Sequence, residues 1–200
     1  MHATGTPESE RRSDRRLIPG RISTVLRERL AWSMEERRAA RIIHKELGLP
    51  AGAGLMDLVD AVGAKRGRPI EIVPLPLSPQ ATGMCLPGEE RDRLIITTNT
   101  SPHHARFILG HELFHLYEGG DDCVSGHHFL GPDALESEVS SLPQGVVDEV
   151  MSRPAFFRTT FERKVEWRAE AFGTVAALQL TGRGDDAGSL TSAFANRRFR

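Results

Sequence analysis

Two histidines, His111 and His115, stand four positions apart, and Glu112 directly follows the first of them. On an α-helix, residues four apart share one face about 6 Å apart, so both imidazoles can bind one metal ion. Glu112 is rotated by about 100° from His111, which brings its carboxylate beside that ion. Zinc lowers the pKa of a water ligand to about 7, and a neighbouring carboxylate can accept its proton as the oxygen attacks a carbonyl. The pattern predicts metal-dependent hydrolysis.

A catalytic zinc ion needs a third protein ligand, and several residues follow the motif. Asp121 would complete the HExxHxxGxxD pattern of small metzincin proteases, but Glu118 stands where that pattern requires glycine. His127 and His128 are adjacent in an irregular segment, where histidines are more often exposed than fixed as ligands. These two residues and Tyr117 are also candidates for stabilising the oxyanion of the reaction, and nothing in the sequence chooses among the three.

Glu166 is the third candidate ligand, and it begins a helical pattern near the end of the chain. Small and apolar residues recur there on one side, at Ala169, Phe172, Gly173 and Ala176. Such a stripe lets two helices pack closely, so that a carboxylate on one can reach an ion held by the other. Glu170 lies one turn after Glu166 and could orient a ligand histidine through its free N–H. In an alternative register, Glu170 is itself the third ligand.

The histidines need a helix, and the surrounding residues predict one. Ser101 is suited to the N-cap and Pro102 to the first helical position, and Gly119 with Gly120 ends the pattern after Tyr117. A β-branched run, Leu94 to Thr98 ("LIITT"), leads into this helix. It is the second strand of a predicted β-hairpin with Pro87 and Gly88 in the turn. We expect this strand to offer its edge to an extended substrate.

Further elements are predicted on either side of the hairpin and the motif helix. Helical spacing over residues 22–47 is interrupted by a capping-box pair, Ser33 and Glu36, which predicts two helices or one bent helix. A second amphipathic helix ends at Gly67, and "RPIEIVPLPL" is a strand bracketed by prolines. Residues 121–154 are predicted to be a long irregular connection, and a last helix to run from about 155 to 180. The predicted class is α+β, with N-terminal helices and a small antiparallel sheet.

The composition of the chain limits which partners and which cellular location we expect. The 200 residues carry 26 Lys and Arg against 27 Asp and Glu, so no global charge favours nucleic acid or an anionic membrane. Two distant cysteines, Cys85 and Cys123, form neither a disulfide framework nor a metal knuckle, so we expect reduced thiols. The polar start and the absence of a membrane-length apolar stretch predict a cytoplasmic protein. We expect a tail at 1–20, one domain at 21–181 and a second tail at 182–200.

These residues together resemble the ImmA/IrrE family of metallo-endopeptidases. The resemblance rests on "RFILGHELFH" and on "EWRAEAFG", where Glu166, Ala169 and Phe172 fit the family pattern Glu-x-x-Ala-Asn-x-Phe-Ala. Glu170 replaces its asparagine, Gly173 replaces its alanine, and the gap between the two motifs is longer than usual. The resemblance implies a zincin-like fold and one zinc ion bound by His111, His115 and Glu166. It also implies limited proteolysis of a helix-turn-helix repressor or an antitoxin, in stress responses or mobile-element control.

Two other functions compete with a peptidase. One is a non-catalytic regulator, or the toxin component of a toxin-antitoxin pair, that binds its partner without cleaving it. The presence of His111, Glu112 and His115 together argues against a dead enzyme. The other is DNA binding through the helices of residues 22–66. Arginines alternate with glutamates there, which dilutes a phosphate-binding surface, so we do not expect direct contact with nucleic acid.

Overall fold

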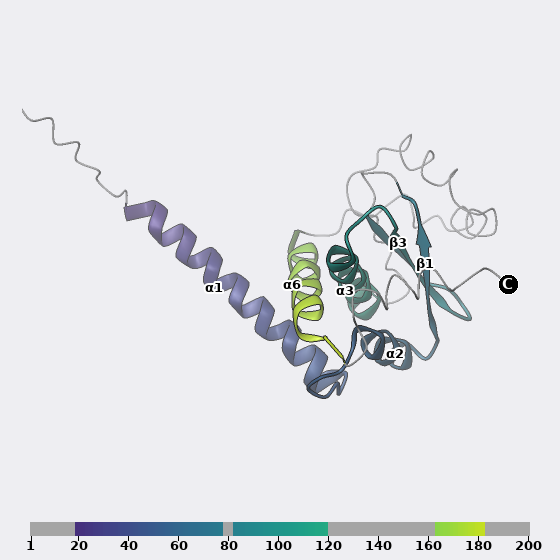
Figure 1. Ribbon diagram of the computed structural model, residues 1–200. Helices are drawn as coiled ribbons and strands as arrows, with labels where there is room; N and C mark the ends of the chain where they lie inside the picture. Colours follow the sequence, from purple (N-terminus) through teal and green to yellow (C-terminus); the bar gives the residue numbers. More distant parts are fainter. Residues whose placement is uncertain (1–18, 78–81, 120–162, 183–200) are drawn as a thin grey trace, which may run out of the picture.

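The structure is a computed structural model that describes residues 19–77, 82–119 and 163–182. Figure 1 shows an α+β arrangement of long helices beside a small sheet. Its elements are α1 (Pro19–Arg41), η1 (Ile42–Glu46), α2 (Leu55–Arg66), β1 (Ile70–Leu75), β2 (Gly83–Leu86), β3 (Asp92–Thr97), α3 (Pro102–Gly119) and α6 (Arg163–Gln179). The predicted connection at 121–154 and nearly all of the two predicted tails lie outside the described residues, as does Cys123.

The three strands form one mixed sheet in the order β1-β3-β2. The predicted hairpin is confirmed, because β2 and β3 pair antiparallel with Leu86 opposite Arg93. The expectation of a purely antiparallel sheet is wrong, because β1 runs parallel to β3, with Ile70 opposite Asp92. The prediction that the "LIITT" strand offers its edge is also wrong. That strand is β3, the central strand, and both of its edges are already paired.

The first helix runs without a break through Ser33 and Glu36, so the predicted interruption there is wrong. Both residues lie inside α1, where each amide is already part of the helical ladder and no cap is needed. The helix then widens into the π-helical turn η1, which buries Ile42 and Ile43. The chain leaves this turn at Gly48, whose φ of 72° lies in the left-handed region that glycine tolerates.

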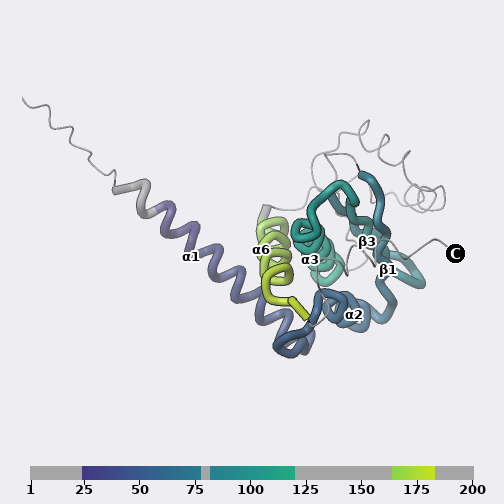
Figure 2. The backbone as a smooth tube through the Cα atoms, in the orientation of Figure 1, coloured from purple at the N-terminus to yellow at the C-terminus, as the bar shows by residue number. Residues whose placement is uncertain are grey.

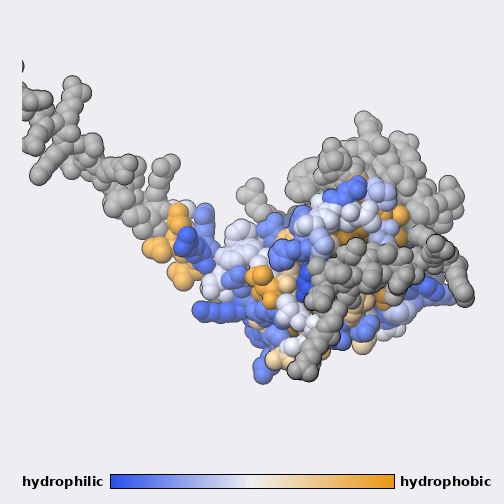
Figure 3. Space-filling view, viewed as in Figure 1, coloured by the Kyte–Doolittle hydropathy of each residue, from blue (hydrophilic) through white to orange (hydrophobic). Residues whose placement is uncertain are grey.

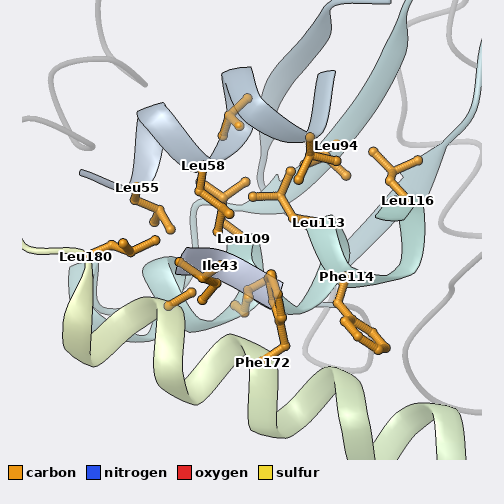
Figure 4. Close-up of a cluster of buried hydrophobic side chains, with 14 of the residues drawn as sticks. Ile43, Leu55, Leu58, Leu94, Leu109, Leu113, Phe114, Leu116, Phe172 and Leu180 are labelled. Atoms are coloured by element: carbon orange, nitrogen blue, oxygen red, sulfur yellow. The ribbon is translucent and has the colours of Figure 1, made fainter. Parts of the chain in front are cut away.

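Helix α3 lies at the centre of the molecule, between the sheet and α6 (Figure 2). Figure 4 shows the apolar side chains that hold these layers together. On one side, Leu109 and Leu113 of α3 point toward Leu58 of α2 and Leu94 of β3. On the other side, the rings of Phe114 and Phe172 lie 5.3 Å apart between α3 and α6. The motif helix is therefore packed on both faces rather than lying on the surface.

A buried ion cluster around Asp92 joins three elements at the start of β3. Asp92 is fully buried and accepts hydrogen bonds from the Arg66 guanidinium, one of them at 3.0 Å, and from the Gly88 N–H at 3.0 Å. Arg68 Nε lies 3.2 Å from the same carboxylate. Arg66 also donates to the carbonyl of Leu116 at 3.1 Å. The cluster therefore fixes the C-terminal ends of α2 and α3 against the sheet.

Helix α1 extends well beyond the rest of the molecule (Figure 1). Its C-terminal half packs on α6, where the rings of Trp32 and Trp167 meet edge to face at 5.0 Å. The projecting half carries exposed apolar side chains, visible in Figure 3 among charged residues. They are Val25, Leu26 and Leu30, and Met34 in the packed half of the helix is exposed as well. Among the described residues, no helix combines the length and the apolar character needed to cross a membrane.

Candidate metal centre

The motif helix α3 forms as its caps predict. The Ser101 hydroxyl accepts a hydrogen bond from the His104 N–H at 3.3 Å, and Pro102 occupies the first helical position. From Ile108 to Leu116 every residue is buried. His111, Glu112 and His115 lie in this stretch, and each is at most 1% exposed. Polar side chains held this deep must meet other polar groups or an ion, because their burial is otherwise costly.

Close packing of α3 on α6 brings a carboxylate to the two histidines. A Cβ atom on Gly110 would lie 2.9 Å from the Cβ of Ala176 and 3.0 Å from the Cα of Gly173. A Cβ atom on Gly173 would lie 2.8 Å from the Phe107 carbonyl oxygen and 3.1 Å from the His111 nitrogen. Only glycine fits at both positions, so the two helix backbones nearly touch beside His111. The predicted close packing along this stripe of α6 is confirmed.

His111, His115 and Glu166 converge at this contact. The Nε2 atoms of the two histidines are 2.8 Å apart. The Glu166 carboxylate, which is 32% exposed, places one oxygen 3.6 Å from His111 Nε2 and the other 3.6 Å from His115 Nε2. Among the described residues, these three form the one group of at least three His, Cys, Asp or Glu whose ligand atoms could hold an ion. In a tetrahedral zinc site, ligand atoms about 2.0–2.1 Å from the ion lie roughly 3.3 Å from one another.

Burial keeps the first histidine in the form that can bind a metal. It lowers the pKa of His111 from 6.5 to about 3, because the charged imidazolium loses its hydration inside the protein. At neutral pH the ring is therefore uncharged, and one nitrogen carries a lone pair. Two imidazoles and one carboxylate are a donor set typical of zinc, and three protein ligands leave a fourth position for water or substrate.

The other predicted site residues lie elsewhere or outside the described residues. Glu170 is exposed one turn beyond Glu166 and is not part of the cluster. The Tyr117 hydroxyl donates to Glu46 at 2.5 Å and lies 3.3 Å from Lys65 Nζ, so the structure does not bring it to the two histidines. Three candidates lie in the part of the chain that the structure does not describe: Asp121, His127 and His128.

Two glycines that position the site are not among the residues predicted from the sequence. Gly110 immediately precedes His111 and makes the helix contact described above. Gly83 begins β2 and lies against Glu112, whose Oε1 would be 2.9 Å from a Cβ atom at that position. A glycine within a predicted helix or strand is a signal of close backbone approach, and both positions carry that signal.

Comparisons with known proteins leave the family open. The chain matches no model of a protein family, and a search of curated proteins finds no match. The metal site is therefore inferred from the geometry of this chain alone.

Proposed function

We propose that this protein is a zinc-dependent endopeptidase of the ImmA/IrrE type. The observation that carries the proposal is the convergence of His111, His115 and Glu166 from two helices, with Glu112 buried at the next position of the motif helix. Each of the four residues belongs to a motif that the resemblance to that family requires. Two buried imidazoles and a half-buried carboxylate fit a divalent ion, because the carboxylate partly offsets its charge.

The three ligands have separate tasks in this proposal. His111 and His115 hold the ion from within a rigid helix, so their positions are fixed by the packing of α3. Glu166 reaches the ion from α6 and supplies a negative charge. A zinc ion held there supplies Lewis acidity, which polarises a peptide carbonyl and acidifies water. The partial exposure of Glu166 means that this side of the site opens toward solvent.

Glu112 is proposed to move the proton during hydrolysis. Glu112 directly follows His111 in α3 and its side chain is fully buried, so its carboxylate is shielded from bulk water. A carboxylate in this position accepts a proton from the attacking water and then donates it to the leaving nitrogen of the peptide. Replacing Glu112 by glutamine removes the base while preserving the size of the side chain.

Strand β2 lies next to the proposed base. It pairs with β3, and all four of its residues are buried. Its first residue, Gly83, lies against Glu112. We propose a cytoplasmic helix-turn-helix repressor or antitoxin as the substrate, which the family resemblance favours.

A cleavage assay tests this function. The full-length protein, the Glu112→Gln variant and a zinc-depleted sample are incubated with helix-turn-helix repressors and antitoxins from the same organism, and fragments are identified by mass spectrometry. We expect one or a few defined cuts by the zinc-loaded parent protein alone. Tight binding of the intact partner, equally by parent and variant and without any cut, would instead identify a non-catalytic regulator.

A further inference from the structure

Gly83 lies between the sheet and the candidate base, with no side chain of its own. It is the first residue of β2, and it pairs with Ile96 of the central strand. A Cβ atom at Gly83 would lie 2.6 Å from Ile108 Cγ2, 2.9 Å from Glu112 Oε1 and 3.0 Å from Glu112 Cγ. Contacts below 3.0 Å are too short for real Cβ atoms, so a larger residue would force a neighbour to move. Helix α3 is therefore in close contact with the strand at this residue.

The two neighbours of Gly83 differ in their freedom to move. Ile108 is β-branched and helical, so one χ1 rotamer dominates and its methyl group cannot easily turn away. It is also 2% exposed and belongs to the main hydrophobic core. Glu112 has three side-chain torsions, and its carboxylate oxygen is the group that meets the strand. A side chain at position 83 would therefore mainly displace the Glu112 carboxylate.

We propose that Gly83 is a positioning residue that holds the Glu112 carboxylate in its working place. The inference rests on the proposed function, because it assigns Glu112 the role of base. The three atoms nearest to a Cβ atom at Gly83 belong to Ile108 and Glu112, so we expect its effect on the carboxylate to be separable from metal binding. Its φ lies outside the positive range, so alanine is compatible with the backbone and acts through its methyl group.

The contact itself can be tested without any activity. Gly83→Ala is introduced into the full-length protein and into its Glu112→Ala variant, and the midpoint of urea unfolding is measured for all four metal-free proteins. In the parent, alanine at 83 meets both Ile108 and Glu112. In Glu112→Ala it meets only Ile108, so we expect its effect on the midpoint to fall to about half. Equal shifts in both backgrounds would overturn the proposed contact.

The consequence for the site is tested with zinc-loaded proteins and with the helix-turn-helix protein that the parent cleaves as substrate. We expect Gly83→Ala to retain one zinc per chain and to cleave about a hundredfold more slowly, as a misplacement of about 1 Å can cause. Gly63→Ala is the matched control. A Cβ there would lie 3.0 Å from the Arg68 carbonyl oxygen, a tight though less severe contact of α2 away from the site. Its cleavage rate should stay at the parent value.

The outcomes separate this inference from the proposed function. Full cleavage by Gly83→Ala would overturn the positioning role and leave the peptidase assignment intact. Loss of zinc from Gly83→Ala would also overturn it, because the effect would then act through the metal ligands. If the parent protein itself does not cleave, the proposed function fails. The unfolding measurements would still report whether Gly83 and Glu112 are in contact.

Discussion

Gly110 of α3 and Gly173 of α6 meet where a side chain on either would collide with the other helix. Their contact lies next to His111 in the sequence and in space, because a Cβ on Gly173 would be 3.3 Å from the Cβ of that histidine. Glu166 stands two turns before Gly173 on the same helix and reaches the two histidines from there. The separation of the two helices therefore sets the separation of the proposed metal ligands.

Replacing Gly173 by alanine tests this relationship. The added methyl group must push α6 away from backbone atoms of α3, which should lower the free energy of unfolding by about 1–3 kcal/mol. Glu166 moves with the helix, so we expect zinc affinity to fall by about tenfold or more. Zinc affinity is measured by competition with a chromophoric chelator. Thr174→Ala, at the next position of α6, is the control and should bind zinc as the parent does. Unchanged affinity in Gly173→Ala would contradict the account.

The choice between the two glutamates of α6 can be settled by metal content. Glu166 faces both histidines, whereas Glu170 is exposed one turn away. We expect Glu166→Ala to lose zinc during dialysis and Glu170→Ala to retain one ion per chain, because only the former removes one of three protein ligands. Inductively coupled plasma mass spectrometry gives the ratio. The reverse pattern would make Glu170 the third ligand, in the alternative register of the sequence motif.

Tyr117 provides a spectroscopic test, because it is the only tyrosine of the chain. Burial and its hydrogen bond to Glu46 raise the pKa of Tyr117 from 10.0 to about 12. The phenol is therefore favoured in the folded state, and its contribution to stability is present below pH 10 and lost as pH rises from 10 through 12. Phenolate absorbance should titrate near pH 12 in the native protein. In Glu46→Gln the midpoint should fall but stay above 10, because burial is the larger cause. A titration midpoint at pH 10 in the native protein would contradict a buried Tyr117 that is hydrogen-bonded to Glu46.

Glu46, the partner of Tyr117, should affect protein stability at acidic pH. The hydrogen bond from Tyr117 and the nearby cations Arg41 and Lys65 lower the pKa of Glu46 below 4.5. A lowered carboxyl pKa stabilises the fold above pH 4.5, and this stabilisation is lost as pH falls below that value. Glu46→Gln should therefore weaken the dependence of thermal stability on pH below 4.5. A pH dependence equal to that of the parent would exclude a role for Glu46.

Asp92 is expected to be the most sensitive charged residue for stability. Asp92→Asn leaves Arg66 and Arg68 without their buried counter-charge, which should lower the free energy of unfolding by about 3–5 kcal/mol. Glu71→Gln is a matched control, because Glu71 pairs with Arg93 at 3.3 Å while its side chain is 38% exposed. That change should cost less than about 1 kcal/mol. Urea unfolding measures the free energy of unfolding of both variants. A similarly small decrease in the two would show that the Asp92 cluster contributes little to stability.

Local patterns were enough to predict the elements that carry the site. Ser101 and Pro102 mark the start of α3, and Pro87 with Gly88 lies in the hairpin turn, because caps and turns depend on residues close in the chain. The same local reasoning failed at Ser33. Its capping-box pattern lies within a helix whose C-terminal half packs on α6, and that long-range packing favours continuity over a local cap.

Relationships between distant segments were harder to predict. The strand "LIITT" was identified, but its place at the centre of the sheet depends on β1 pairing in parallel, which no local pattern indicates. The approach of Glu166 to the histidines followed from the small residues on α6. Gly110 and Gly83, which complete the packing around the site, carry only a general signal of close approach. The partners of Asp92 come from the end of α2, the loop after it and the hairpin turn, so no regular spacing in the sequence predicts them.

Zinc stoichiometry in the purified full-length protein tests the central claim most directly. The protein is loaded with one equivalent of zinc and dialysed, and bound metal is measured beside His115→Ala and Glu112→Gln. We predict one ion per chain in the parent and in Glu112→Gln, because the base is not a ligand, and almost none in His115→Ala. A parent protein that retains no zinc, or a His115→Ala variant that retains as much as the parent, would contradict a metal centre built from His111, His115 and Glu166.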